Sequence, residues 1–425
     1  METKYIKETQ NLIDFINKSY SPFHVVENVK EMLNENGFEE LLENEKFKIK
    51  RGGKYYVSRN SSSLIAFKIP ESFVGYSIIA SHTDSPSFKV KANPEMLKDG
   101  KFTTLNVEGY GGMLCAPWFD RPLSIAGRVF VDGGDGVEQK LLNFDKDMVS
   151  IVNLAIHQNR EANTGYKYSK QKDMLPILGL GENSGELNKL IAKQLDVDVD
   201  SILDSDLFLY NRMNGTIWGL DDEFFSTPKL DDLGCVYPSV RALIDTEASS
   251  TIALIALFDN EEVGSGTKQG ALSDFLPTII ERISFALSLD IEQKAIMKAN
   301  SFMLSADNGH SLHPNYMEKS DPVNHTVPGG GIVIKYAANQ KYTTDAQSAA
   351  FIKKILKDSG VPYQEFTNNS DVAGGSTLGN LSNQHYSLNT VDIGCSQLAM
   401  HSPYETGGTK DIFYMIEGMS AFLKR

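Results

Sequence analysis

The sequence has few cysteines and no long apolar run. Its 425 residues include only three cysteines, none in a CxxC pair: Cys115, Cys235 and Cys395. An odd number of widely spaced cysteines argues against a disulfide framework and favours a reducing compartment. No apolar stretch approaches the roughly 20 residues of a transmembrane helix, and the first ten residues contain no apolar signal core. We therefore expect a cytoplasmic protein without a membrane partner.

Positive charge is also scarce. The chain has 41 Lys and Arg against 55 Asp and Glu, a formal net charge of -14, which disfavours nucleic acid and anionic membranes as partners. Neither the GxSxG motif of serine hydrolases nor the Walker lysine pattern is present. Low-complexity tracts and internal repeats are absent too. At 41% apolar and 23% charged residues, the composition is typical of a globular protein. The length of 425 residues is sufficient for two or three domains.

Strand and helix patterns alternate in both the first and last parts of the chain. Strands are expected at 63–68, 76–81, 251–258 and 387–393, and helices at 4–19, 22–36, 232–246, 273–288, 344–358 and from about 408. Ser21-Pro22 predicts one helix start, and Thr343 or Thr344 is the expected N-cap of another. The segment between is richer in hairpin-like pieces. We predict an α/β domain (1–94 and 206–425) with a mixed, largely parallel central sheet flanked by helices, interrupted by a mostly β domain (95–205).

A pair of glutamates carries the most specific chemical signal. Glu261 and Glu262 follow the apolar run 251–258, so a buried strand delivers two carboxylates to one edge of the sheet. One carboxylate of such a pair can hold a metal ion while its neighbour moves a proton.

Other motifs stand at strand ends or in polar turns. His82 and Asp84 follow the strand 76–81, and i, i+2 spacing lets Asp84 accept a hydrogen bond from His82 and fix its tautomer for metal binding. Chance occurrence in a polar turn is the alternative. Asp231 and Asp232 are adjacent, and taken alone this pair is better explained by the preference for acidic residues at a helix start.

Asp307 follows the apolar segment 302–306, and His401 lies in a loop. His310 and His313 also suggest a metal site, but polar capping or packing explains their spacing as well. In chain order the set reads His, Asp, Glu-Glu, Asp, His.

These motifs and the sequence segments around them closely resemble those of the aspartyl aminopeptidase family of dinuclear zinc exopeptidases. The similarity spans nearly the whole chain. It includes SPFHVVENVKEML at 21–33, SHTDSPSFKVK at 81–91, WFDRPLSIAGRV at 118–129, KLDDLGC at 229–235, FDNEEVGS at 258–265, SADNGHSLHPNY at 305–316 and MHSPYETGG at 400–408.

The resemblance implies two zinc ions per subunit, with cobalt or manganese as possible substitutes. His82, Asp231 and Asp307 would hold one ion, and Asp231, Glu262 and His401 the other. Glu261 would be the general base and Asp84 the partner of His82. The peptide bond after the bridging Asp231 is expected to be cis.

The resemblance also implies the substrate and the assembly. The enzyme would remove the N-terminal residue, an Asp or Glu, from peptides with a free N-terminus, and Lys335 would lie near the side chain of that residue. A strand lysine that faces solvent is the alternative for Lys335. The inserted domain would form dimers, twelve subunits would assemble, and His157 would reach a neighbouring active site.

Three other functions stay open. One is an aminopeptidase with broad or neutral preference. Another is a related hydrolase acting on acylated amino acids or larger peptides. The third is a non-catalytic protein that uses the metal for assembly.

Overall fold

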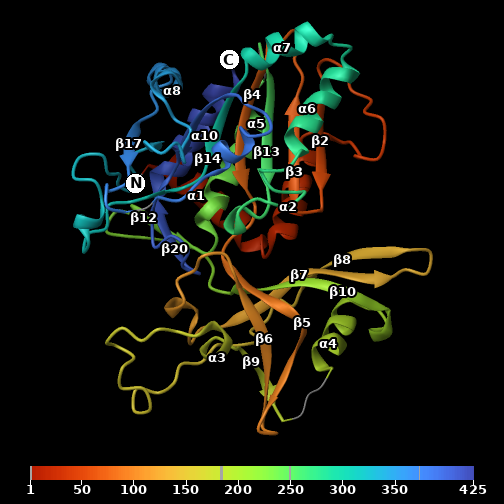
Figure 1. Ribbon diagram of the computed structural model, residues 1–425, viewed down its shortest axis with the longest axis vertical. Coiled ribbons are helices and arrows are strands. Elements are labelled where there is room, and N and C mark those ends of the chain that lie inside the picture. Colours follow the sequence, from red (N-terminus) through yellow and green to blue (C-terminus); the bar gives the residue numbers. More distant parts are fainter. Residues whose placement is uncertain (1, 182–184, 248–249, 373) are drawn as a thin grey trace. The chain divides into compact units, whose positions relative to one another are not determined.

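The computed structural model describes residues 2–181, 185–247, 250–372 and 374–425 (Figure 1). The chain forms two compact units. The first comprises Met1–Asp84, Gly215–Met400 and Glu405–Arg425, and the second comprises Ser85–Asn214 and His401–Tyr404. The predicted insertion, 95–205, lies within the second unit.

The first unit is built on a mixed sheet, nine-stranded among the described residues. Its spatial order is β1 (Glu39–Glu40), β2 (Lys54–Arg59), β3 (Ser63–Lys68), β13 (Ile252–Phe258), β4 (Tyr76–His82), β14 (Phe302–Ala306), β18 (Asn389–Gly394), β16 (Ile332–Tyr336) and β17 (Tyr363–Thr367). The four strands from β13 to β18 run parallel to one another. The α/β fold with a mixed sheet flanked by helices is thus confirmed.

Strand β13 shows why its apolar run is continuous. Ala253, Ile255 and Leu257 pack in one hydrophobic core, whereas Leu254 and Ala256 pack in another. A strand covered on both faces needs apolar side chains at every position, because successive side chains point to opposite faces.

Helices cover both faces of this sheet. One core contains residues of α1 (Thr3–Lys18), α2 (Pro22–Glu35), α5 (Leu230–Asp245), α8 (Ala346–Asp358) and α10 (Thr409–Leu423). The other contains residues of α6 (Phe275–Ala286), α7 (Ile291–Ala299) and α9 (Leu378–Ser382). Among the described residues, no helix combines the length and apolar character needed to cross a lipid bilayer.

Helix starts agree with the sequence at α2 and differ at α8. Pro22 occupies the first turn of α2, with Ser21 as its N-cap. The predicted caps of α8, Thr343 and Thr344, are wrong. The N-cap is Asp345, whose carboxylate accepts from the backbone N–H of Ser348 at 2.8 Å. A carboxylate at this position accepts the hydrogen bond, and its negative charge is also stabilised by the positive N-terminal end of the helix dipole.

A second sheet in the first unit joins β11 (Thr216–Trp218), β12 (Phe224–Thr227), β20 (Glu405–Gly408), β19 (Ser396–Leu398) and β15 (Gly309–His310). The other unit contains a sheet of β8 (Val137–Asn143), β7 (Leu123–Asp132), β10 (Ile202–Asn211), β5 (Ser87–Lys98), β6 (Phe102–Tyr110) and β9 (Ile177–Leu180), with the helices α3 (Lys170–Asp173) and α4 (Glu186–Leu195). Its own hydrophobic core includes Phe88, Trp118 and Leu142.

Candidate metal centre

Three adjacent parallel strands of the central sheet end at one group of polar side chains. His82 is the last residue of β4 and pairs in register with Phe258 at the end of β13. The short 3₁₀ turn Glu261–Val263 follows β13, and Asp307 follows β14. Because parallel strands end at the same edge of a sheet, their following residues converge there.

The two aspartates come from the start of α5. Its first turn is irregular, with φ/ψ of -83°/107° at Asp231 and -120°/24° at Asp232. The peptide bond between them is cis, as the resemblance predicts. The backbone N–H of Asp231 donates to Glu405 Oε2 at 2.9 Å, and Asp232 Oδ2 accepts from the backbone N–H of His82 at 3.1 Å.

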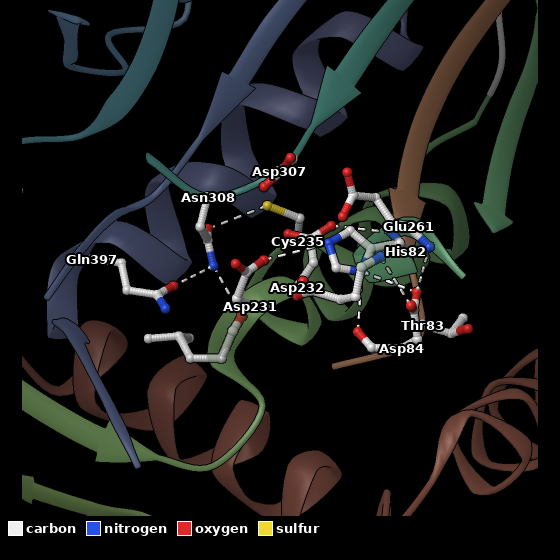
Figure 2. Close-up of polar contacts among 12 residues, drawn as sticks. His82, Thr83, Asp84, Asp231, Asp232, Cys235, Glu261, Asp307, Asn308 and Gln397 are labelled. Atoms are coloured by element: carbon white, nitrogen blue, oxygen red, sulfur yellow. Dashed lines mark hydrogen bonds and ion pairs between the residues drawn. The ribbon is translucent and has the colours of Figure 1, made fainter. Parts of the chain in front are cut away.

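These residues form two overlapping groups of potential ligands. In one group, His82, Asp231, Asp232 and Asp307 offer ligand atoms that all lie within 4.8 Å of one another. In the other, His82, Glu261 and Glu262 meet the same limit. The four members of the first group are between 0% and 9% exposed. Figure 2 shows His82 beside the two aspartates, with Glu261 and Asp307 nearby.

Asp84 contacts His82 as the sequence predicts, and it does so through two atoms. Nδ1 of His82 lies 3.0 Å from the backbone carbonyl of Asp84 and 3.3 Å from its Oδ1. Both are acceptors, so Nδ1 carries the proton. In the neutral ring Nε2 is then a lone-pair donor. It lies 3.4 Å from Asp231 Oδ1.

Crowding and burial perturb the acidic groups. Burial, reinforced by Asp307 and Asp84 and opposed by His82, raises the pKa of Glu261 to about 8. Burial also raises the pKa of Asp307 to about 6, against the opposing effect of Lys335.

The remaining groups shift in the same direction. Burial and the neighbouring Asp231 raise the pKa of Glu262 well above its usual range. Burial raises the pKa of Asp232 too, despite the opposing charge of His82. For His82, burial lowers the pKa, but Asp232 and the other carboxylates outweigh it and leave the pKa well above its usual range.

The donor set fits a metal ion. With a neutral His82, the Nε2 lone pair would face a carboxylate oxygen, and two acceptors at that distance repel unless a cation or a proton lies between them. The raised pKa of His82 expresses the same need for positive charge at this point. Several buried carboxylates around the same point add to the need for positive charge. Imidazole nitrogen and carboxylate oxygen are both ligands that zinc accepts.

The remaining histidines considered from the sequence are His401, His157, His310 and His313. His401 opens the short segment His401–Tyr404 of the second unit, with a left-handed φ of 65°. His157 is exposed in a turn of that unit. His310 and His313 are in neither cluster described above; His313 Nδ1 instead accepts from the backbone N–H of Asn315 at 3.2 Å. Ligand and catalytic roles for His401 and His157 stay predictions.

Lys335 is buried in β16. Its side chain is 1% exposed, so the alternative of a solvent-facing strand lysine is wrong. The ammonium donates to the backbone carbonyl of Asp307 at 2.7 Å and lies 3.9 Å from Asp307 Oδ2. Its predicted contact with substrate remains a prediction.

The sequence did not single out three further residues near this cluster. Asp232 has no predicted role of its own, whereas its carboxylate belongs to the cluster. Glu405 bonds the backbone of Asp231, and the Asn308 side chain bonds the carbonyl of Leu230 at 2.9 Å. The adjacency of Asp232 to Asp231 was a usable signal, but the other two contacts join residues 174 and 78 positions apart.

Buried imidazole and carboxylates at the carboxyl edge of an α/β sheet are the side chains expected at the metal site of a metal-dependent α/β enzyme. The sequence profile of the family described as "Aminopeptidase I zinc metalloprotease (M18)" matches residues 15–423. The chain belongs to this family and is a zinc aminopeptidase, a hydrolase.

Individual relatives are similar to this chain over nearly its whole length. A protein named "Probable M18 family aminopeptidase 2" from Clostridium acetobutylicum is 47% identical over 422 residues, covering 97% of this chain and 98% of the relative. The cryo-EM structure of the Ape4 and Nbr1 complex contains a chain with a TM-score of 0.95 and 33% identity, covering 100% of this chain and 87% of that one. The S. cerevisiae mApe1 dodecamer gives a TM-score of 0.87 at 28% identity, covering 99% and 97% of the two chains.

Proposed function

We propose that this zinc aminopeptidase uses two zinc ions and removes acidic residues, Asp or Glu, from the N-termini of peptides. The convergence of His82, Asp231, Glu262 and Asp307 beside Glu261 carries the proposal. His82, Asp231 and Asp307 would hold one ion. Asp231 would also hold the second ion with Glu262 and His401, the last named from the family resemblance. Cobalt or manganese can occupy such nitrogen and oxygen sites as well.

Zinc, when bound, would polarise the scissile carbonyl and lower the pKa of water. Glu261 is the group available for proton transfer. It follows β13 beside the proposed ligands, and burial raises its pKa to about 8 in the cluster without a cation. Glu261 would take a proton from the attacking water and pass it to the leaving amine.

Asp84 would support both the metal ligand His82 and the proposed base Glu261 through hydrogen bonds. Its carboxylate accepts from the backbone N–H groups of Glu261 and Glu262 at 3.1 and 3.2 Å, and it also contacts His82 Nδ1. This arrangement would hold the His82 ring with Nε2 toward the ion and keep the glutamate turn in place.

The acidic preference rests on Lys335, whose positive charge would pair with a substrate carboxylate. Self-association is proposed because a similar structure is named a dodecamer. Dimers formed through the second unit would then be the building blocks, and the exposed His157 would act in the active site of a neighbouring subunit. The free thiols of Cys115, Cys235 and Cys395 fit a cytoplasmic location.

A substrate panel tests this proposal. The zinc-loaded enzyme would be assayed on peptides that differ only in an N-terminal Asp, Glu, Leu or Lys, each free or N-acetylated. We expect kcat/KM for Asp and Glu to exceed that for Leu and Lys by at least about tenfold, since a buried charge pair contributes on the order of 1.4 kcal/mol or more.

Each of the other possible results of this substrate panel would indicate a different function. Preference for Leu or Lys would replace acidic specificity with a neutral or broad one. Cleavage of acetylated peptides would indicate an acylamino acid hydrolase or an enzyme of larger peptides. Full zinc loading without any hydrolysis would indicate a role in metal-dependent assembly.

A further inference from the structure

Asn308 lies directly after the proposed ligand Asp307, and its side chain is 4% exposed. Its Nδ2 donates to the backbone carbonyl of Leu230 at 2.9 Å and to Gln397 Oε1 at 2.8 Å. Its Oδ1 accepts from the backbone N–H of Cys395 at 3.0 Å and from Cys235 Sγ at 3.4 Å. Figure 2 shows Asn308 between Cys235 and Gln397, above the segment that carries Asp231.

The orientation of this amide is fixed by its backbone partners. The carbonyl of Leu230 can only accept and the N–H of Cys395 can only donate, so Nδ2 and Oδ1 cannot exchange places. Among side chains of this size, an amide supplies a donor and an acceptor at once. A carboxylate would face the Leu230 carbonyl with an acceptor, and an apolar side chain would leave both backbone groups unpaired in the interior.

The bonds of Asn308 join the segments that carry two proposed ligands. Leu230 immediately precedes Asp231, and Asp307 immediately precedes Asn308. Each ligand is also held from another direction: Glu405 accepts from the N–H of Asp231, and Lys335 donates to the carbonyl of Asp307. Loss of the amide would free the start of α5 from the end of β14.

We infer that Asn308 is a positioning residue that sets the spacing of Asp231 and Asp307 for the metal ion. This inference rests on the proposed function, in which both aspartates hold the same zinc. Residues that orient metal ligands typically change metal affinity or activity by about 10–100-fold when they are replaced.

Two replacements separate positioning from charge. Asn308→Leu removes every hydrogen bond of the side chain at similar volume. Asn308→Asp keeps an acceptor for Cys395, loses the donor to Leu230 and adds a negative charge. If charge alone governed zinc binding, Asn308→Asp would bind zinc more tightly, whereas loss of positioning weakens binding in both variants.

Thr9→Val is the matched control for ordinary stability loss. The Thr9 side chain is fully buried in α1, and its hydroxyl donates to the backbone carbonyl of Thr409 at 2.8 Å. This replacement also removes a buried bond from a side chain to the backbone, but it lies on an element without proposed ligands.

The full-length protein would be stripped of metal, and its zinc Kd measured by competition with a chromophoric chelator, together with its Tm. We expect zinc Kd to rise about 10–100-fold in Asn308→Leu and Asn308→Asp and to stay within about twofold of wild type in Thr9→Val, whose Tm falls. A zinc Kd of Asn308→Leu within about twofold of wild type overturns the inference. Should that variant fail to fold, an unchanged or tighter Kd in Asn308→Asp overturns it.

Asp307→Ala distinguishes this failure from failure of the proposed site. If Asp307→Ala weakens zinc binding and the Asn308 variants do not, the site stands and Asn308 has only a structural role. If Asp307→Ala also leaves the zinc Kd unchanged, the proposed ligand set is wrong.

Discussion

The carboxylate of Asp84 accepts a hydrogen bond from the backbone N–H of Glu261 at 3.1 Å. The same carboxylate accepts from the N–H of Glu262 at 3.2 Å, and Asp84 also contacts Nδ1 of His82. One fully buried acid therefore ties the end of β4 to the turn after β13, and so joins a proposed metal ligand to the proposed base.

Replacing Asp84 by Asn tests this connection. An amide presents one acceptor and one donor, so its NH₂ group would face a backbone N–H and one bond would be lost. We expect kcat or zinc affinity to fall about 10–100-fold, as measured by steady-state kinetics and chelator competition. Wild-type values for both would show that Asp84 has no part in orienting the site.

Glu261→Gln should separate chemistry from metal binding. The amide cannot carry the proton between the attacking water and the leaving amine, so we expect kcat to fall about 10²–10⁴-fold with zinc content unchanged. Glu262→Gln is the matched control, because it replaces the neighbouring proposed ligand and should lower zinc content. Loss of zinc from Glu261→Gln and not from Glu262→Gln would reverse the two assignments.

Metal removal should affect both activity and stability. Without a cation, the buried carboxylates around Asp231 repel one another, and the folded state loses the free energy of zinc binding. We expect a chelator to abolish hydrolysis and lower Tm, and added zinc to restore both. Full activity in protein with no detectable metal would contradict the metal-dependent mechanism.

Lys335→Met separates the substrate role of this lysine from its structural one. If its ammonium pairs with the substrate, kcat/KM for peptides with N-terminal Glu should fall at least about tenfold more than for N-terminal Leu. The methionine retains much of the side-chain volume. An equal fall for both substrates would leave Lys335 with its observed role of binding the carbonyl of Asp307.

His24 predicts a pH effect on stability away from the metal ligands. Burial, with a smaller effect of Lys229, lowers the pKa of His24 to about 4, and Ser21 Oγ lies 2.8 Å from its Nδ1. Because the folded pKa lies below the unfolded value of about 6.5, the folded state excludes a proton that the unfolded chain binds. The stability associated with neutral His24 is present above pH 6.5 and is lost as pH falls toward 4.

Urea unfolding of wild type and His24→Gln at pH 7 and pH 5 measures this effect. We expect wild type to lose about 1–2 kcal/mol more unfolding free energy than the variant over this interval. Comparing two proteins under the same conditions cancels the titration of their shared carboxylates. Equal losses would mean that His24 titrates normally in the folded protein.

Much of the fold was predictable because its signals are local. The uninterrupted apolar run of β13 predicted a strand buried on both faces, and Glu261 follows where that run ends. His82 and Asp307 were found in the same way, at the ends of β4 and β14. The N-cap of α8 was mispredicted because two threonines and Asp345 are adjacent, and only the backbone decides which of them precedes the first helical turn.

The sequence by itself determined which residue types stand at the strand ends, and hence that imidazole and carboxylates suited to zinc meet at one edge of the sheet. Tertiary structure alone decided how they are held. Asn308 bonds Leu230 and Glu405 bonds Asp231 across 78 and 174 residues, and Lys335 turns inward to the carbonyl of Asp307. Periodicity and motif spacing report neighbours along the chain. The hydrogen bonds that orient these ligands form between segments brought together only when the sheet and its helices pack.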